Sequence, residues 1–117
     1  MKEREISVFN LQNDIHSFNE SRLAFRENNN PQTLAMGICI EAAELLQEVR
    51  YKPGNYTDEE REMIEHELAD VIIYCFSFAT VMGINIPEAV SDKLTFNEQR
   101  FPPDITTEDY VNGRHSN

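Results

Sequence analysis

The feature that most constrains the fold is the uncharged stretch Val71–Pro87, which directly follows an acidic segment. Between Val71 and Val81 the stretch is apolar on nearly all sides of a helix, and such a helix must be covered all round. It is short for spanning a bilayer and contains Ser, Thr, Gly and Asn, so we expect a buried helix and no membrane partner. A single domain of this size would struggle to cover it, so we expect a homodimer or a tetramer.

Helical periodicity, with turn residues between the periodic segments, predicts an all-α fold. The run Asn28–Pro31 separates the first helix from the second, since proline is tolerated in a first helical turn. Thr57 and Glu60 have the Thr-x-x-Glu spacing of a capping box, and Gly83 suits the position just after a helix. The alternation typical of β-strands is absent from the sequence. We predict a four-helix bundle protomer with helices at about residues 5–27, 31–50, 57–82 and 87–100.

The length of 117 residues predicts one helical domain, residues 1–102, followed by a polar tail, residues 103–117. The tail lacks a period, and we expect it to be loosely held. Ten Lys and Arg against 21 Asp and Glu give a net charge of −11. This balance disfavours a nucleic-acid duplex or an anionic membrane as partner, because both require a basic face. It favours binding of cations, and a solvated acidic surface is the alternative interpretation.

The two cysteines, Cys39 and Cys75, lie inside apolar runs and lack the spacing of a metal site. We interpret both as reduced core residues. The first residues of the chain are charged and are not followed by the apolar segment of a secretory signal. These features predict a cytoplasmic protein.

Two pairs of carboxylates lie inside apolar sequence. The second predicted helix carries Glu41 and Glu44, and the third carries Glu67 and Asp70. Each pair is three residues apart, which puts both carboxylates on one face of a helix, one turn apart. A short connection makes the two helices antiparallel neighbours, so that the acidic faces can meet. Glu48, one turn beyond Glu44, either extends this site or lies on the surface.

These four acids have no basic residue near them in the sequence. Lys and Arg are absent between Glu27 and Val49 and again between Glu62 and Asp92. Because burial of an ionised carboxylate is costly unless it is neutralised, we expect a divalent cation, and oxygen-only ligands suit Mg²⁺ or Mn²⁺. His66 does not complete the Glu-x-x-His pair of a di-iron bundle. The alternative is four solvated acids on amphipathic helices.

The ordered acids resemble the signature of the MazG-like all-α nucleoside triphosphate pyrophosphohydrolases, a family that includes dCTP pyrophosphatases. That signature is Glu-x-x-Glu, a gap, and then Glu-x-x-Asp. The flanking sequences agree as well, and they read IEAAELLQEV, ELADVIIY and KLTFNEQRFP. The resemblance covers about residues 18–102. It implies hydrolysis of a (d)NTP to the monophosphate and pyrophosphate with Mg²⁺, for which Mn²⁺ is a possible substitute, in nucleotide-pool cleansing.

The resemblance also implies roles for individual residues. The metal ligands would be Glu41, Glu44, Glu67 and Asp70. Glu44 is our candidate for the carboxylate that takes the proton of the attacking water. Tyr74 matches a tyrosine that helps to hold the nucleotide, and positions near the phosphates are matched by Lys93, Asn97 and Arg100. The alternatives are a core aromatic residue for Tyr74 and solvated surface charges for the two cations.

The positions that contact the base differ from the family pattern. Phe25, Asn29 and Tyr51 stand where the dCTP-preferring relatives have tryptophan, histidine and tryptophan. Phe and Tyr keep a π face for stacking, whereas the hydrogen bonds that select a base are changed. The sequence therefore leaves the base open. A second hypothesis for the function is a non-catalytic helical interaction or regulatory dimer that retains the bundle.

Overall fold

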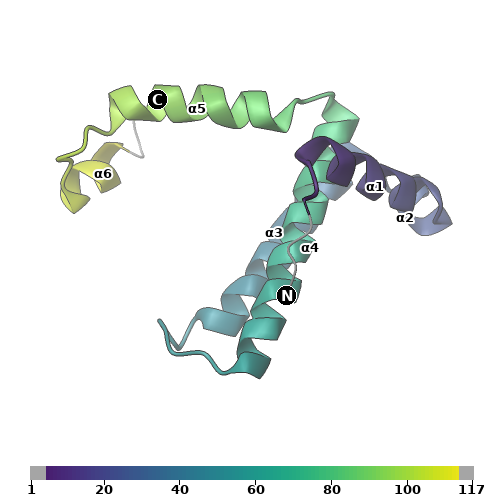
Figure 1. The fold of residues 1–117 in the computed structure, drawn as a ribbon, viewed down its shortest axis with the longest axis horizontal. Helices are drawn as coiled ribbons and strands as arrows, with labels where there is room; N and C mark the ends of the chain where they lie inside the picture. The colour runs from purple at the N-terminus through teal and green to yellow at the C-terminus, as the bar shows by residue number, and fades with distance from the viewer. Residues whose placement is uncertain (1–4, 114–117) are drawn as a thin grey trace. The chain divides into compact units, whose positions relative to one another are not determined.

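The computed structural model describes residues 5–113, and within that range all regular secondary structure is helical (Figure 1). The predicted all-α fold class is therefore confirmed. In chain order the helices are α1 (Val8–Glu20), α2 (Leu23–Glu27), α3 (Pro31–Val49), α4 (Asp58–Met82), α5 (Ile86–Arg100) and α6 (Thr107–Gly113).

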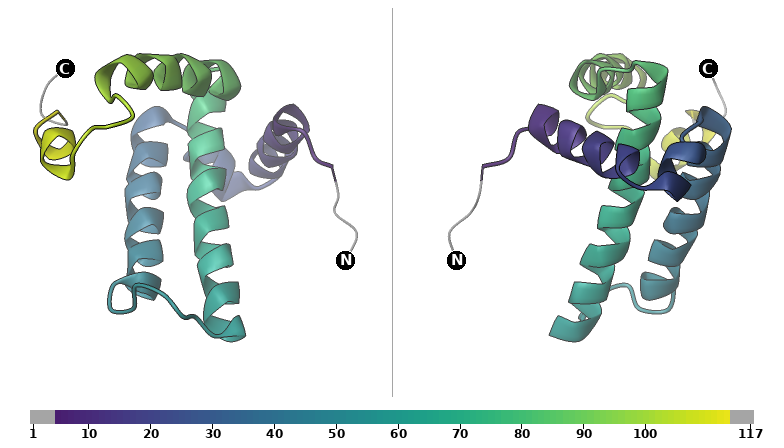
Figure 2. Two further views of the ribbon diagram at one scale, coloured as in Figure 1. Left: turned by 60° about the vertical axis from the view of Figure 1, so that its left-hand side comes forward. Right: turned by 90° about the vertical axis from the view of Figure 1, so that its right-hand side faces the viewer.

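The long helices α3 and α4 form the main packed pair of the structure. The loop between them spans residues 50–57, and the two helices run antiparallel side by side, as Figure 2 shows. Within this loop the hydroxyl of Tyr56 donates to the carbonyl of Lys52, and the Lys52 ammonium lies 2.6 Å from a carboxylate oxygen of Glu60. These contacts tie the loop to the first turn of α4. The antiparallel arrangement expected from the short connection is thus present.

Capping residues explain where α3 and α4 begin and end. Asn30 accepts a hydrogen bond from the backbone N–H of Thr33, and Pro31 occupies the first helical turn of α3. Thr57 and Glu60 cap α4 reciprocally, which confirms the predicted capping box. Gly83 ends α4 with φ of 67°, a left-handed conformation in which glycine has no Cβ penalty.

The first predicted helix is interrupted, which corrects the single helix expected at residues 5–27. Helix α1 ends at Glu20, and Arg22 is extended with φ of −119° before α2 begins. The hydroxyl of Ser21 donates to the carbonyl of Phe18, an alternative to continued helical bonding that serine offers the backbone. The break lets Phe25 fold back, so that its ring centroid lies 5.6 Å from that of Phe18.

The contacts divide the chain into two compact units, with the boundary between Ile84 and Asn85. The first unit holds α1 to α4, and its buried residues include Ile15, Leu34 and Ala79. The second holds α5 and α6. In the second unit the rings of Phe101 and Tyr110 lie 5.3 Å apart between centroids.

The predicted polar tail contains more structure than its lack of periodicity indicated. Residues 107–113 form α6, and the Thr106 hydroxyl accepts a hydrogen bond from the backbone N–H of Asp109 at its start. The last four residues of the tail lie outside the described range. The boundary predicted at residue 102 does not coincide with the division between the two units and stays a prediction.

Among the described residues, no single helix is long and apolar enough to cross a membrane, and only α4 and α5 taken together meet those criteria.

Apolar side chains remain uncovered on the helix pair. The prediction that both cysteines are core residues is wrong for Cys39, which is exposed on α3 beside Met36 and Ile40. Its apolar sequence context reflects an outward face of α3 rather than the interior. On α4, Ile72 and Ile73 are each 39% exposed, so the cover expected for this helix is incomplete within the chain.

Candidate metal centre and adjoining pocket

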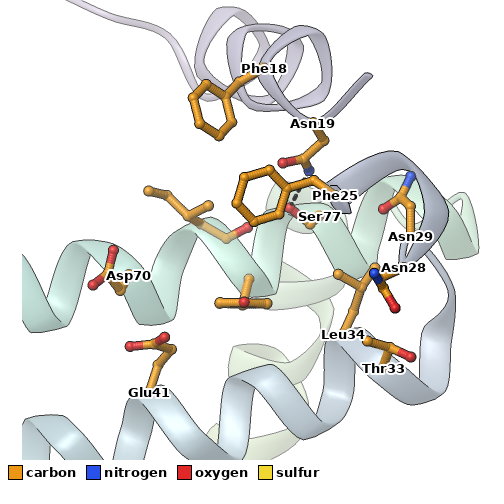
Figure 3. A pocket seen from close by; sticks show the side chains of 12 residues that line it. Phe18, Asn19, Phe25, Asn28, Asn29, Thr33, Leu34, Glu41, Asp70 and Ser77 are labelled. Atoms are coloured by element: carbon orange, nitrogen blue, oxygen red, sulfur yellow. Dashed lines mark hydrogen bonds between the residues drawn. The ribbon is translucent and has the colours of Figure 1, made fainter. Parts of the chain in front are cut away.

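Three of the four predicted acids converge between α3 and α4. One carboxylate oxygen from each of Glu41, Glu67 and Asp70 lies within 4.8 Å of the others. Glu41 comes from α3, and Glu67 and Asp70 come from successive turns of α4. Figure 3 shows the carboxylates of Glu41 and Asp70 facing each other across the two helices. The three-residue spacing on adjacent antiparallel helices therefore produces a shared acidic cluster.

Glu44 and Glu48 act on this cluster although they lie outside the set of three. Glu44 is half-buried on α3, and its carboxyl group contacts those of Glu41 and Glu67 closely enough to raise the pKa of both. The charge of Glu48, also half-buried, contributes to the raised pKa of Glu67. Asp70 is exposed, which corrects the expectation that all four predicted ligands are buried.

Two oxygens of the cluster are buried without a hydrogen-bond partner, namely Oε2 of Glu41 and Oε2 of Glu67. Salt bridges among the described residues join Lys52 to Glu60 and Arg61 to Glu65, and neither involves the cluster. An unpaired buried carboxylate oxygen loses hydration with nothing in exchange. An all-oxygen donor set of this kind fits a hard divalent cation.

Because no cationic side chain in the described part of the chain neutralises these buried carboxylates, the pKa values of Glu41 and Glu67 are raised. Burial, followed by the neighbouring carboxyl of Glu44 and the charges of Asp70 and Glu67, raises the pKa of Glu41 to about 7. Burial and the charge of Glu44 also raise the pKa of Glu67. Both shifts mean that the folded protein disfavours the ionised forms when no cation is bound. A divalent cation would reverse that preference.

A cavity of about 360 Å³ adjoins the cluster and includes Glu41 and Asp70 in its wall. The α1–α2 segment contributes two aromatic rings, Phe18 and Phe25, and α4 contributes Tyr74. In Figure 3 the acids lie at one end of the view and the asparagines at the other, with Phe25 between them. The cavity therefore combines an anionic end with an aromatic and amide-lined end.

Tyr74 is positioned by a glycine on the neighbouring helix. Gly37 is buried in α3, and a Cβ built on it would lie 2.9 Å from Cζ of Tyr74 and closer still to Cδ1 and Cε1. The absence of a side chain at Gly37 thus allows the ring to pack directly against α3. Tyr74 lies one turn after Asp70 on α4, which brings its ring into the same cavity as the acids.

Of the three residues predicted to contact the base, two line the cavity and one does not. Phe25 and Asn29 line the cavity. Tyr51 does not line it, because Tyr51 follows the end of α3, about 15 Å along the helix axis beyond Glu41. It is 85% exposed, with the Arg50 guanidinium 4.6 Å from its ring centroid.

The predicted phosphate-contacting residues lie on α5, in the second unit. Lys93, Asn97 and Arg100 are spaced four and three residues apart, so they share one face of that helix. Asn97 and Arg100 are half-buried, and Lys93 is exposed with its ammonium 4.5 Å from the ring centroid of Phe96. Their role toward phosphates stays a prediction.

The sequence interpretation missed the polar residues that line the cavity opposite the acids. Asn19 and Ser77 are both buried and are hydrogen-bonded to each other over 2.8 Å. A signal for them was available, since Asn19 lies one turn after the apolar Ile15 and Ser77 interrupts the apolar run of α4. A polar residue inside an apolar stripe requires a partner, and the two provide it for each other.

A model of the MazG-like family matches residues 36–109, which include the acids of α3 and the whole of α4 and α5. The chain belongs to this family. The resemblance noted in the sequence is thereby confirmed.

Similar proteins include mouse and human enzymes. The chain is 27% identical over 94 residues to dCTP pyrophosphatase 1 of Mus musculus, with 75% of this chain and 55% of that protein covered. The corresponding identity to dCTP pyrophosphatase 1 of Homo sapiens is 26% over 94 residues, with the same coverage. The chain thus spans about half the length of the curated relatives it matches. A crystal structure of a pyrophosphatase from Archaeoglobus fulgidus is similar with a TM-score of 0.68 and 32% identity, covering 87% of this chain and 98% of that one.

Proposed function

We propose that the chain is a Mg²⁺-dependent nucleoside triphosphate pyrophosphohydrolase, which converts a (d)NTP to the monophosphate and pyrophosphate. The observation that carries the proposal is the cluster of Glu41, Glu67 and Asp70 oxygens in the wall of an aromatic-lined cavity. Membership of the MazG-like family and the similarity to two kinds of pyrophosphatase support it. Nucleotide-pool cleansing in the cytoplasm is the role that we propose for this activity.

The carboxylate oxygens of the cluster are the kind of ligand that Mg²⁺ prefers. Glu41, Glu67 and Asp70 would hold the ion, with Glu44 as the fourth carboxylate at its side, and Mn²⁺ would be an acceptable substitute. When bound, the ion would polarise phosphate oxygens and neutralise the charge that builds on them. The two orphaned oxygens of Glu41 and Glu67 would then gain the partner that the protein itself does not provide.

The side chains around the cluster would divide the remaining tasks. Phe18, Phe25 and Tyr74 offer aromatic surfaces against which a base or sugar can pack. Glu44 would accept the proton of the attacking water, whose oxygen forms a bond to phosphorus as the α–β phosphoanhydride bond breaks, which gives the monophosphate and pyrophosphate. Lys93 and Arg100, which share one face of α5, are the cations that we propose for contact with the phosphates, as the family resemblance implies.

We further propose that the chain works as a homodimer or a tetramer. Met36, Cys39 and Ile40 form an outward-facing apolar surface on α3, which we call the α3 apolar face. Met36 and Ile40 are 58% and 57% exposed. Contiguous exposed apolar side chains are typical of an association surface.

Pyrophosphate release from a panel of (d)NTPs with MgCl₂ tests the activity. We expect wild-type turnover, and we expect Glu41→Gln and Asp70→Asn to reduce it by about 100-fold or more, because each removes a charged ligand from the site. Glu62→Gln, an isosteric change of an exposed acid on α4, is the matched control and should leave turnover unchanged.

Two results would count against the proposal in different ways. Turnover that is insensitive to both cluster variants would remove these residues from the site. Absence of turnover with every nucleotide would favour the non-catalytic helical dimer, for which the α3 apolar face is the relevant feature.

A further inference from the structure

Helix α1 carries part of the aromatic wall of the cavity, so the way α1 is held on α4 decides where that wall lies. Phe18 belongs to α1, Phe25 folds back against it from α2, and both rings line the cavity. Figure 2 shows α1 lying across α4 rather than alongside it. The position of the two rings therefore depends on the contacts at this crossing.

Apolar packing at the crossing is sparse. The buried residues of α1 are Ile15 and Asn19, so Ile15 is the one apolar side chain of this helix that is buried. Two smaller cavities lie beside the crossing, one of about 220 Å³ next to Ile15 and one of about 270 Å³ next to Gln12 and Thr80. Side chains beside unfilled space lose contacts on that side. Apolar contacts alone therefore fix α1 only weakly on α4.

Two hydrogen bonds between side chains join α1 to α4 at the crossing. Nε2 of Gln12 donates to Oγ1 of Thr80 over 3.1 Å, and Nδ2 of Asn19 donates to Oγ of Ser77 over 2.8 Å. Figure 3 draws the second of these bonds. Each hydroxyl in turn donates to the backbone carbonyl four residues earlier on α4. Because a hydroxyl has one proton, this second bond leaves its oxygen as an acceptor for the amide.

The two bonds differ in their distance from the cavity. The Asn19–Ser77 bond lies in the cavity wall. The Gln12–Thr80 bond lies outside it, since Gln12 precedes Phe18 by six residues, or about 9 Å along the helix axis. A helix held at one point can pivot, whereas a second bond at a distance fixes its angle and its axial position. The Gln12–Thr80 bond supplies that second point.

We infer that Gln12 and Thr80 are positioning residues for the cavity, because their hydrogen bond holds α1 at the angle that keeps the Phe18 and Phe25 rings in the cavity wall. The inference rests on the proposed function in taking a nucleotide as the occupant. Gln12 and Thr80 act through the aromatic rings and not on the acids of α3 and α4. Loss of their bond should therefore weaken nucleotide binding and leave the chemical step and the metal site unchanged.

Steady-state pyrophosphate release tests the inference with a nucleotide that the wild type hydrolyses. Thr80→Val removes the hydroxyl at nearly constant shape, and Gln12→Met removes the amide at similar length. We expect each change to raise KM by about three- to tenfold, the ratio that corresponds to one hydrogen bond, with kcat unchanged. An unchanged KM in both folded variants, or a loss of kcat at constant KM, would overturn the inference.

Further variants separate positioning from a purely structural role, which would lower the melting temperature without raising KM. Thr80→Ser keeps the hydroxyl and should keep the KM of wild type. Thr95→Val is the matched control, because it removes an exposed hydroxyl that makes the same bond to a carbonyl four residues earlier, on α5. It should leave KM unchanged, and an equal rise of KM in Thr95→Val would contradict the inference.

The double variant Gln12→Met/Thr80→Val should raise KM no more than either single change, because both single changes break the same bond. Effects on KM that multiply in the double variant would show that the two residues act separately. Replacement of both partners by apolar groups is tolerated better than removal of one. The double variant therefore decides the question if a single variant fails to fold by circular dichroism.

Titration calorimetry without turnover keeps this inference apart from the proposed hydrolase. Binding of dAMP, dCMP, dGMP and dTMP should weaken in Thr80→Val by the same factor as KM rises, while binding of Mn²⁺ alone should not change. Weaker monophosphate binding in a protein without turnover would refute the hydrolase and leave the positioning role standing. Turnover with the same KM in every variant would refute the positioning role and leave the hydrolase standing. Weaker Mn²⁺ binding in Thr80→Val, or no binding of any monophosphate to wild type, would also overturn the inference.

Discussion

At the scale of single residues, the site is governed by desolvation of like charges. Glu41 and Glu67 lie between α3 and α4 with one oxygen each buried and unpaired, and no cation of the described residues forms a salt bridge with them. Burial and the neighbouring carboxylates therefore raise the pKa of both residues above the usual range. Perturbed carboxylates in a cavity wall are typical of functional sites. This state costs stability that a bound cation would restore.

The raised pKa of Glu41 predicts how stability depends on pH in the metal-free protein. The pKa rises from 4.5 in the unfolded chain to about 7 in the folded one, so the folded protein holds a proton that the unfolded chain has already lost. The free energy of unfolding should therefore fall as pH increases from about 4.5 to about 7. Urea unfolding in EDTA at several pH values measures this slope.

Glu41→Gln is the control for that measurement, because glutamine does not ionise. The variant should show a shallower slope, with a remainder due to Glu67, whose pKa is raised in the same direction. Identical slopes in the two proteins would show that Glu41 titrates normally.

The contact between Gly37 and Tyr74 gives a second prediction at this scale. Gly37→Ala should lower the free energy of unfolding by about 1–3 kcal/mol, because the added methyl group overlaps the Tyr74 ring. Gly54→Ala is the matched control, since a Cβ at Gly54 meets no atom within 4 Å. Chemical denaturation compares the two, and an equal effect would mean that the ring moves aside freely.

At the scale of elements, local sequence rules placed most helix ends. The bounds of α3, α4 and α5 agree with prediction to within about a residue, because Asn30, Thr57 and Gly83 supply strong capping signals. The break between α1 and α2 escaped prediction. Ser21 and Arg22 carry no proline or glycine signal, and the break is stabilised by the packing of Phe25 on Phe18, which periodicity does not reveal.

The contribution of the α4 capping box to stability can be tested by substitution of Thr57. Thr57→Ala should cost about 1 kcal/mol of unfolding free energy, because the N–H of Glu60 loses its acceptor. Thr57→Ser keeps the hydroxyl, so its free energy of unfolding should lie within a few tenths of a kcal/mol of the wild-type value. Thermal unfolding followed by circular dichroism measures both, and equal stabilities of the Ala and Ser variants would exclude a capping contribution.

At the scale of the whole molecule, the chain leaves apolar surface that a single copy does not cover. Cys39 was expected in the core and is exposed, while Ile72 and Ile73 on α4 are only partly covered. Composition and periodicity predicted that α4 must be packed on all sides, but they could not show which surface packs against it. The acidic cluster was predictable because helix geometry alone aligns residues three apart, whereas the asparagine-lined end depends on contacts between α1 and α4 that are distant in sequence.

The proposed assembly predicts a change of mass. Ile40→Glu places a charge on the α3 apolar face and should shift the protein toward a 13.6 kDa monomer in sedimentation velocity. Asn10→Asp adds the same charge on α1 and should leave the assembly intact. A wild-type protein that sediments as a monomer at all concentrations would contradict the assembly.

The most direct test of the site is anomalous scattering from a crystal grown with Mn²⁺, which reports the ion itself. We predict a peak between α3 and α4, with oxygens of Glu41, Glu67 and Asp70 about 2.0–2.3 Å from it. No peak at saturating Mn²⁺, with the three side chains turned toward solvent, would contradict a metal-dependent hydrolase.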